Sequence, residues 1–305
     1  MVTAFAPGKC ILFGEHAVVY GEPAVAVSID AGVEVTISES NKWILEGMPF
    51  EPSRHPHISH IINDIFQYRG NPLKIDIRSS LFSAAGLGSS AALSNSMGAA
   101  LHQFTKPNEP LDLISLAKIG HSAEANAQQG RASPTDTATS ALGGCIVVSG
   151  QKVRGTRHVF DATLETPEGS RSWSVCEATL PEIEDTWIVL GFTGIGSPTG
   201  KMVEGVSELI GREPKKMDEI RAIGNITSSG LDSLSAGDME GVGSAMNSCH
   251  ERLRNLRVSC PELENLISAV ESHSLGAKLT GAGGGGCMVS LTRHPKRVAE
   301  CKEIA

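Results

Sequence analysis

The stretch that most constrains this chain runs from Ser83 to Ala100, where a glycine-rich loop leads directly into a run of small residues. Gly86 and Gly88 allow left-handed backbone angles and a close approach of the backbone to a ligand. The residues after Ser90 favour a helix, whose first turn offers unpaired N–H groups and the positive end of the helix dipole. Loop and helix together predict an anion site, usually for a phosphate. A small-residue helix packed closely on a sheet is the alternative, because the loop matches neither GxxxxGK[ST] nor GxGxxG.

Composition argues against several classes of function. The 305-residue chain has a formal net charge of −8, and aromatic residues make up 4% of it. A negative charge and few aromatic side chains argue against a nucleic-acid partner. No apolar run has the length of a membrane span, and the first residues lack the pattern of a signal peptide. The seven cysteines are scattered without CxxC spacing, so we expect reduced thiols, no zinc site and a cytoplasmic protein.

Three charged or titratable residues interrupt the apolar N-terminal region. Lys9 precedes one apolar run, and Glu15 and His16 separate it from a second run that ends at Tyr20. We expect a first strand broken at Pro7-Gly8, followed by two apolar runs that pair as strands. A buried charge needs a partner or a ligand, so these side chains are candidates for a site. The alternative is a structural Lys9–Glu15 ion pair with His16 as a hydrogen-bonded spacer.

A histidine-rich segment opens a helix predicted over residues 54–68. Its isoleucines recur with helical spacing, and His55, His57 and His60 lie near its start. Three histidines suggest a metal site, but Pro56 occupies a typical helix-start position and no nearby carboxylate completes a ligand pattern. We therefore expect these histidines to lie in a solvated first turn.

Two acidic residues follow the small-residue helix. A second helix is predicted over residues 111–129, with Glu124 late in it, and the segment 130–137 ends that helix. Asp136 lies in this segment between two threonines, before a strand expected over residues 138–148. Aspartate is common in turns and caps of this kind, so a structural role is the alternative to a catalytic one.

A second glycine-rich segment lies near the end of the chain. It follows a polar surface hairpin predicted over residues 151–178, a buried strand over 187–192 and a series of helical segments. Residues 276–291 then have the pattern of strand, glycine loop and strand. Four consecutive glycines leave the backbone bare, and they make either a tight, crowded hairpin or a loop with room for a phosphate.

Four motifs occur in order and together resemble the GHMP kinases, named for galactose, homoserine, mevalonate and phosphomevalonate. They are APGKCILFGEHAVVYGEPAVA, GLGSSAA, SPTDT and KLTGAGGGGCMV, and they span the chain from Ala6 to about Leu291. In its Gly-Glu-His-Ala-Val-Val-Tyr-Gly form, the first motif is most similar to the mevalonate kinases, and SPTDT is similar to their archaeal type. A galactokinase is expected to carry Asp-Tyr-Asn-Gly soon after Glu-His, where this chain has Val-Val-Tyr-Gly.

The resemblance implies an α/β (α+β) fold with two domains and an active site in the cleft between them. We expect an N-terminal ATP-binding and catalytic domain over residues 1–180, with an unusual left-handed βαβ crossover. The C-terminal domain, over residues 181–305, is expected to be ferredoxin-like.

The resemblance also implies roles for residues already singled out. Asp136 is implied to take the proton from the substrate hydroxyl, with Lys9 beside it to lower its pKa and to stabilise the moving phosphoryl group. Ser90 and Glu124 are implied to ligate Mg²⁺, which prefers oxygen ligands. The residues expected to bind the ATP phosphates are Gly86, Leu87, Gly88, Ser89, Ser90, Gly281, Gly283 and Gly284. The residues expected to contact the hydroxy-acid substrate are Glu15, His16 and Thr199.

Three departures from the family pattern bear on the expected site. The family usually has Pro-x-Gly-x-Gly-Leu-Gly-Ser-Ser, and the leading positions here are Phe82, Ala84 and Ala85. The spacing from Glu124 to Asp136 is one residue longer than usual, with the extra residue expected near 127–129, and one residue corresponds to about 100° of helix rotation. Arg257 replaces an expected glycine.

The implied activity is transfer of the ATP γ-phosphate to the primary hydroxyl of mevalonate, giving 5-phosphomevalonate for isoprenoid synthesis. The implied assembly is a homodimer. One alternative keeps the fold and changes the substrate to phosphomevalonate or another small hydroxy metabolite. For a phosphorylated substrate we would expect additional basic residues, and the first motif offers only Lys9. The other alternative is a kinase-like binding protein without catalysis, against which the presence of Lys9, Ser90, Glu124 and Asp136 argues.

Overall fold

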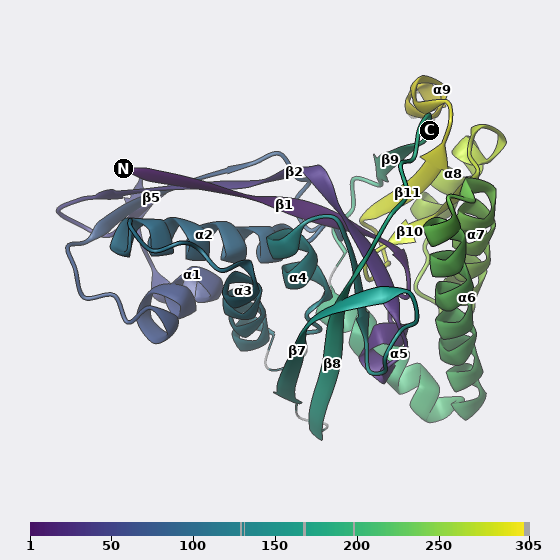
Figure 1. The fold of residues 1–305 in the computed structure, drawn as a ribbon, viewed down its shortest axis with the longest axis horizontal. Helices are drawn as coiled ribbons and strands as arrows, with labels where there is room; N and C mark the ends of the chain where they lie inside the picture. The colour runs from purple at the N-terminus through teal and green to yellow at the C-terminus, as the bar shows by residue number, and fades with distance from the viewer. Residues whose placement is uncertain (129, 131, 167–168, 198, 302–305) are drawn as a thin grey trace.

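The computed structural model describes residues 1–128, 130, 132–166, 169–197 and 199–301. These residues form a mixed α/β fold with one large and one small sheet, which confirms the predicted fold class (Figure 1). No helix among them is long and apolar enough to cross a membrane. All seven cysteines lie within the described ranges, and none of them is in a disulfide.

The large sheet is built from the first half of the chain, and its described strands run in the order β4-β3-β5-β2-β6-β8-β7, with β1 paired to β2. Its strands are β1 (Val2–Phe13), β2 (Ala24–Glu39), β3 (Ile44–Leu45), β4 (Met48–Pro49), β5 (Leu73–Ser79), β6 (Cys145–Ser149), β7 (Thr156–Thr166) and β8 (Gly169–Ala178). Strands β3 and β5 pair in parallel, and the other described pairs are antiparallel. The hairpin predicted over residues 151–178 therefore forms the β7–β8 edge of this sheet.

The N-terminal strands differ from the prediction. Strand β1 continues through Pro7-Gly8, where its pairing with β2 shifts register instead of breaking, because a bulge tolerates a proline that cannot donate a ladder hydrogen bond. The second apolar run is a 3₁₀ helix, Ala17–Tyr20, and not a strand. Gly14 and Gly21, with φ of +97° and +89°, turn the chain at its two ends, so the run never extends.

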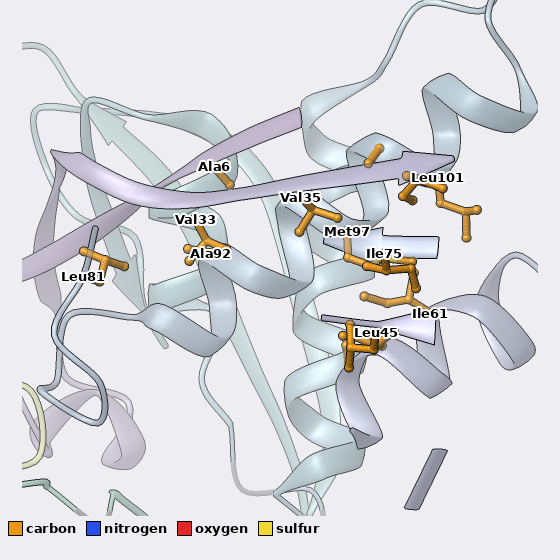
Figure 2. Close-up of a cluster of buried hydrophobic side chains, with 14 of the residues drawn as sticks. Ala6, Val33, Val35, Leu45, Ile61, Ile75, Leu81, Ala92, Met97 and Leu101 are labelled. Atoms are coloured by element: carbon orange, nitrogen blue, oxygen red, sulfur yellow. The ribbon is translucent and has the colours of Figure 1, made fainter. Parts of the chain in front are cut away.

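Helices cover one face of the large sheet and bury a core against it (Figure 1). They are α1 (Pro56–His60), continued by a π-helical turn (Ile61–Ile65), α2 (Ser89–Thr105), α3 (Leu113–Ala127) and α4 (Thr135–Leu142). Figure 2 shows Met97 and Leu101 of α2 beside Ile75 of β5 and Ile61 of the π turn. The small residues of α2 let it lie close to β1 and β2, so the start of α2 is held near the centre of the sheet.

The second half of the chain builds the small sheet, β10-β11-β9, and the helices packed on it. Its elements are β9 (Trp187–Phe192), α5 (Thr199–Arg212), α6 (Met217–Ala236), α7 (Met239–Asn255), α8 (Pro261–Val270), β10 (Gly276–Thr280), β11 (Cys287–Thr292) and α9 (Pro295–Glu300). Strands β10 and β11 are the antiparallel pair predicted around the glycine loop. Lys278 and Thr280 of β10 contact β1 directly, which brings this glycine loop to the large sheet.

Candidate active site

The two glycine-rich segments meet backbone to backbone. A Cβ added at Gly86 would lie 2.7 Å from the carbonyl oxygen of Thr280, and one at Gly281 would lie 2.9 Å from the Cα of Gly86. Both glycines have positive φ, +78° and +86°. The amide of Cys287 donates to the carbonyl of Ala85 at 2.9 Å, which fixes the far end of the second loop. The bare backbones therefore make the crowded contact, and room for a phosphate beside them stays a prediction.

The first loop ends at the start of α2, as the sequence predicts. Gly88 is the residue before the helix, with φ of +72°, and it makes no side-chain cap. Ser89 and Ser90 form the first turn, where N–H groups lack intrahelical partners. Leu87 is buried in the core, and its carbonyl accepts from the amide of Lys9 at 3.0 Å. The start of α2 is thus tied to β1 through the loop that precedes it.

Lys9 and Asp136 form an ion pair beside this loop. Lys9 Nζ lies 3.2 Å from Asp136 Oδ1 and donates to the carbonyl of Gly86 at 2.8 Å. The lysine side chain is 2% exposed, whereas Asp136 keeps 40% of its side-chain area open to the cleft. Asp136 lies in the first turn of α4, where a loop followed by a strand was expected. The Asn95 side chain fixes that turn by donating to the carbonyl of Thr137 at 2.9 Å.

Lys9 lowers the pKa of Asp136, as expected, but the net shift of this pKa is upward. Burial in the surrounding protein raises the pKa of Asp136 above its ordinary value, the Lys9 charge opposes this, and the nearby Glu124 carboxylate adds to it. A carboxyl with a raised pKa is a stronger base once it is ionised. The ion pair keeps the lysine next to that base without removing its basicity.

Glu124, in the last turn of α3, lines the same cavity as Asp136. Its side chain is 6% exposed, and Oε1 is buried without a hydrogen-bond partner among the described residues. Gln128 Nε2 donates to Oε2 at 2.5 Å. Burial alone would raise the pKa of Glu124, but contacts with His57, Ser90 and Gln128 outweigh it and lower the pKa. An ionised carboxylate with a free buried oxygen, close to the Ser90 hydroxyl, fits a hard divalent cation.

The position of Glu124 bears on the extra residue before Asp136. Helix α3 ends at Ala127. The extra residue is expected near 127–129, and Gln129 of this stretch lies outside the described residues. Glu124 faces the cavity despite the longer spacing. No cluster of three or more His, Cys, Asp or Glu side chains in the described chain could hold a metal by itself. A cation here would therefore rely on few protein ligands, as Mg²⁺ bound to nucleotide phosphates does.

His57 is a residue of this region that the sequence analysis assigned to a solvated turn. It lies at the start of α1 with 21% of its side chain exposed, and its Nε2 is 3.3 Å from Glu124 Oε1. His60, on the same helix, contacts Ser122 of α3 at 2.9 Å. The expectation of solvated histidines is therefore wrong for these two, because α1 packs against α3 through them. The 67-residue separation from Glu124 leaves no local pattern that could have revealed the contact.

A cavity of about 380 Å³ opens beside Asp136 and Glu124. Thr199, at the start of α5, lines it, as do Tyr20 and Arg171. Arg171 is the one lysine or arginine in the described lining, and it reaches the cavity from β8, where it also donates to the carbonyl of Val19. Arg171 cannot be recognised from the sequence, because a charged residue on a polar hairpin has the pattern of an ordinary solvated side chain.

Glu15 and His16 have other partners. Glu15 is buried and forms an ion pair with Lys278, and His16 Nε2 lies 2.9 Å from the carbonyl of Ala282. Neither belongs to the described lining of the cavity. The alternative of a Lys9–Glu15 pair is wrong, since Lys9 pairs with Asp136. Contact of Glu15 and His16 with a substrate stays a prediction.

The two positions where the chain lacks a family glycine keep the glycine-like backbone. Ala84 and Arg257 have φ of +52° and +62°, in the left-handed region that favours glycine. Ala84 is held there by the amide of Ser197, which donates to its carbonyl at 2.7 Å. Ala85 is 1% exposed and packs in the core below the loop. At Ala84, contacts with neighbouring residues therefore keep the backbone in the left-handed conformation although the glycine is absent.

Comparison with known proteins points to one family. The GHMP kinases N terminal domain matches residues 57–144, and the GHMP kinases C terminal domain matches residues 231–305. The mevalonate kinase of Archaeoglobus fulgidus is 31% identical over 96% of this chain and 93% of its own length. The mevalonate kinase of Methanothermobacter thermautotrophicus is 33% identical over 94% of this chain and 89% of its own.

Solved structures agree on the fold. The L. major mevalonate kinase in complex with R-mevalonate superimposes with a TM-score of 0.78 at 24% identity, over 100% of this chain and 92% of that one. The Streptococcus pneumoniae phosphomevalonate kinase reaches 0.76 at 18% identity, over 100% and 96%. Family matches in both halves and near-complete alignment with curated relatives lead to one conclusion: the chain belongs to the GHMP kinase family.

Proposed function

We propose that this chain is an ATP-dependent mevalonate kinase, which transfers the γ-phosphate of ATP to the primary hydroxyl of mevalonate to give 5-phosphomevalonate. The observation that carries the proposal is the Lys9–Asp136 ion pair, 3.2 Å long, at the junction of the cavity and the first glycine loop. The identity of about 30% to mevalonate kinases over nearly the whole chain supports the same substrate.

Asp136 is proposed as the general base. Its carboxylate would accept the proton of the substrate hydroxyl as the oxygen forms its bond to the γ-phosphorus and the bond to ADP breaks. A base in hydrogen-bond reach typically contributes on the order of 10²–10⁴-fold in rate. The exposed part of Asp136 faces the cavity, so a hydroxyl bound there can reach it.

The phosphate chain is proposed to lie along the two glycine loops. Gly86 to Ser90 would offer backbone N–H groups and the start of α2, and Gly281, Gly283 and Gly284 would close over them with bare backbone. Lys9, which donates to the Gly86 carbonyl, is proposed to stabilise negative charge that moves toward the acceptor. Phosphoryl transfer depends mainly on such positioning and charge stabilisation.

Ser90 and Glu124 are proposed to hold Mg²⁺, which would neutralise phosphate charge during transfer. The buried, unpartnered Oε1 of Glu124 is the structural support for this assignment. Thr199 and Arg171, which line the same cavity, are proposed to bind the hydroxy acid, with Arg171 as the cation for its carboxylate. Glu15 and His16 remain proposed contributors to this end.

The test is a coupled ADP-release assay with purified protein, ATP, Mg²⁺ and a panel of acceptors that includes mevalonate, phosphomevalonate, homoserine and galactose. We expect turnover with mevalonate far above that with the others. Preference for phosphomevalonate would overturn the substrate assignment, and absence of turnover with every acceptor would favour a binding protein.

The Asp136→Asn variant tests the base. It should still fold, with reduced stability because Lys9 loses its counterion, should bind ATP and mevalonate, and should lose kcat by on the order of 10²–10⁴-fold. Asparagine keeps the shape of the side chain, so a purely structural Asp136 would leave the kcat of the folded variant close to wild type.

Assembly and location complete the proposal. From the family resemblance, we propose a homodimer in the cytoplasm. Light scattering at several protein concentrations tests the dimer, and fractionation of the source cells tests the location.

A further inference from the structure

His57 joins α1 to the carboxylate that lines the cavity. Its Nε2 lies 3.3 Å from Glu124 Oε1, although the two residues are 67 positions apart and belong to different helices. Figure 1 shows α1 beside α3, and the two helices pack directly on each other. The contact places an imidazole against the oxygen of Glu124 that has no hydrogen-bond partner in the described structure.

The His57 imidazole contacts Oε1 of Glu124 but makes no hydrogen bond with it. The distance is close, but the geometry does not make a hydrogen bond, so both His57 Nε2 and Glu124 Oε1 remain unpartnered. Gln128 fixes the other oxygen, Oε2, with a hydrogen bond of 2.5 Å. The carboxylate is therefore confined from two sides, by α1 and by its own helix, while Oε1 keeps its lone pairs for a ligand.

We propose that His57 is a positioning residue for Glu124, which keeps Oε1 directed at the divalent cation of the nucleotide complex. This inference rests on the proposed function, in which Glu124 is a ligand of Mg²⁺. Side chains that orient a metal ligand typically change metal affinity by about 10–100-fold when they are removed. The role depends on the place of the imidazole and not on a change in its protonation.

The competing explanation is that His57 only packs α1 against α3. His60 provides the matched control, because it lies one turn later on the same helix and contacts the same neighbour. Its Nε2 is 2.9 Å from Ser122 Oγ and its Nδ1 is 2.8 Å from Asp64 Oδ2, with no contact to Glu124. A packing role predicts similar effects for the two histidines, whereas a positioning role predicts an effect for His57 alone.

The experiment measures the affinity of a fluorescent ADP analogue for the full chain, once with Mg²⁺ and once with EDTA. The Kd in EDTA divided by the Kd with Mg²⁺ gives the contribution of the metal to nucleotide affinity. Measuring this ratio involves no catalytic turnover. We expect His57→Phe to reduce this ratio by about tenfold, with the Kd in EDTA unchanged. His57→Gln, which keeps a nitrogen donor, should recover part of the ratio, and His60→Phe should match wild type.

The outcomes separate this inference from the proposed function. If Glu124→Gln reduces the ratio and His57→Phe does not, the positioning role is wrong and the metal assignment stands. If Glu124→Gln leaves the ratio unchanged, the metal assignment fails and the inference fails with it. A ratio that rises in His57→Phe would mean that the imidazole competes with the cation, which also overturns the proposal. Should His57→Phe lower the melting temperature strongly, His57→Asn replaces it, because asparagine stays polar but is too short to reach Oε1.

Discussion

Lys278 and Glu15 form an ion pair that is closed to solvent, with 0% and 1% of their side chains exposed. Lys278 comes from β10, and Glu15 follows the end of β1, so the pair joins the small sheet to the first sequence motif. The same ammonium donates to the carbonyl of Leu279 at 2.6 Å and to that of Ile11 at 3.4 Å. Burial raises the pKa of Glu15, and Lys278 opposes that shift. The charge of the buried Glu15 carboxylate therefore depends on Lys278.

We predict that Lys278→Met lowers the free energy of unfolding by about 3–5 kcal/mol, because it leaves the Glu15 carboxylate buried without its cation. The double variant Lys278→Met/Glu15→Gln should recover part of this loss. Lys74→Met is the control, since Lys74 pairs with Asp76 at the surface, where a pair contributes at most about 1 kcal/mol. Urea denaturation measures all three. A Lys278→Met protein as stable as Lys74→Met would contradict the prediction.

The Lys278–Glu15 pair also illustrates what the sequence could and could not predict. The position of Lys9, Glu15 and His16 among apolar residues correctly indicated buried charges that need partners. Their partners lie far along the chain: Asp136 for Lys9 and Lys278 for Glu15. No periodicity or spacing encodes such pairing, so the alternative of a Lys9–Glu15 pair, which joins the two nearest charges in the sequence, is wrong.

Features that depend only on residues close together in the sequence were predicted well. The glycine loop before α2 and the glycine hairpin between β10 and β11 depend on neighbouring residues alone. Two local predictions were wrong. The break expected at Pro7-Gly8 is a register shift in the pairing of β1 with β2, and the strand expected at residues 17–20 is a 3₁₀ helix. Neither outcome can be predicted without knowing how β2 pairs. Arg171 and the contact of His57 were missed because tertiary packing brings β8 to the cavity and α1 against Glu124. The four ordered motifs supplied the overall fold class, which periodicity could not.

Lys9 is predicted to set the pH dependence of the reaction through Asp136. Asp136 must be ionised to act, so the rate falls as the pH drops through its pKa. Burial raises that pKa and Lys9 opposes the rise. Removing the cation in Lys9→Met should raise the pKa further and move the acid limb of kcat to higher pH, besides lowering kcat. The pH profile of the residual activity measures the shift, with Lys106→Met, at a surface pair with Glu109, as control. An acid limb at the wild-type pH would show that Lys9 does not act on Asp136.

Gly86 is predicted to be required for the contact between the two glycine loops. Alanine at Gly86 would place a Cβ 2.7 Å from the Thr280 carbonyl oxygen, at a φ of +78°. Gly155 has nearly the same φ, +77°, with open space around the added Cβ. Both Gly→Ala variants should lose about 1–2 kcal/mol from the left-handed backbone. Only Gly86→Ala should also weaken ATP binding, by at least tenfold, because the loop must move. Calorimetric titration with ATP decides, and equal affinities for the two variants would refute the prediction.

His250 is predicted to make the protein less stable as the pH falls below neutral. It is buried between α7 and α8, with Nε2 3.1 Å from Glu264 Oε1 and Nδ1 accepting from the amide of Leu279 at 3.5 Å. Burial lowers the pKa of His250 to about 4 from an unfolded value of 6.5. Between these two values the unfolded chain binds more protons than the folded one, so the free energy of unfolding increases with pH. The stability due to the neutral imidazole is present above about pH 6.5 and is lost as the pH falls toward 4, by on the order of 3 kcal/mol in full.

The variant His250→Gln removes this titration and keeps a polar side chain beside Glu264. Denaturant unfolding at a series of pH values from 7.5 to about 5 gives the slope for both proteins; this window stays above the range where Glu264, with a pKa lowered to about 2, takes up its proton. We expect the variant to be less stable at pH 7.5, because it loses the fit of the ring, and to have a flatter slope than wild type. His16 and His121, whose pKa values are also lowered by burial, remain in both proteins, so the difference between the slopes isolates His250. Parallel slopes would mean that His250 keeps an ordinary pKa in the folded protein and that its buried contacts do not depend on the neutral ring.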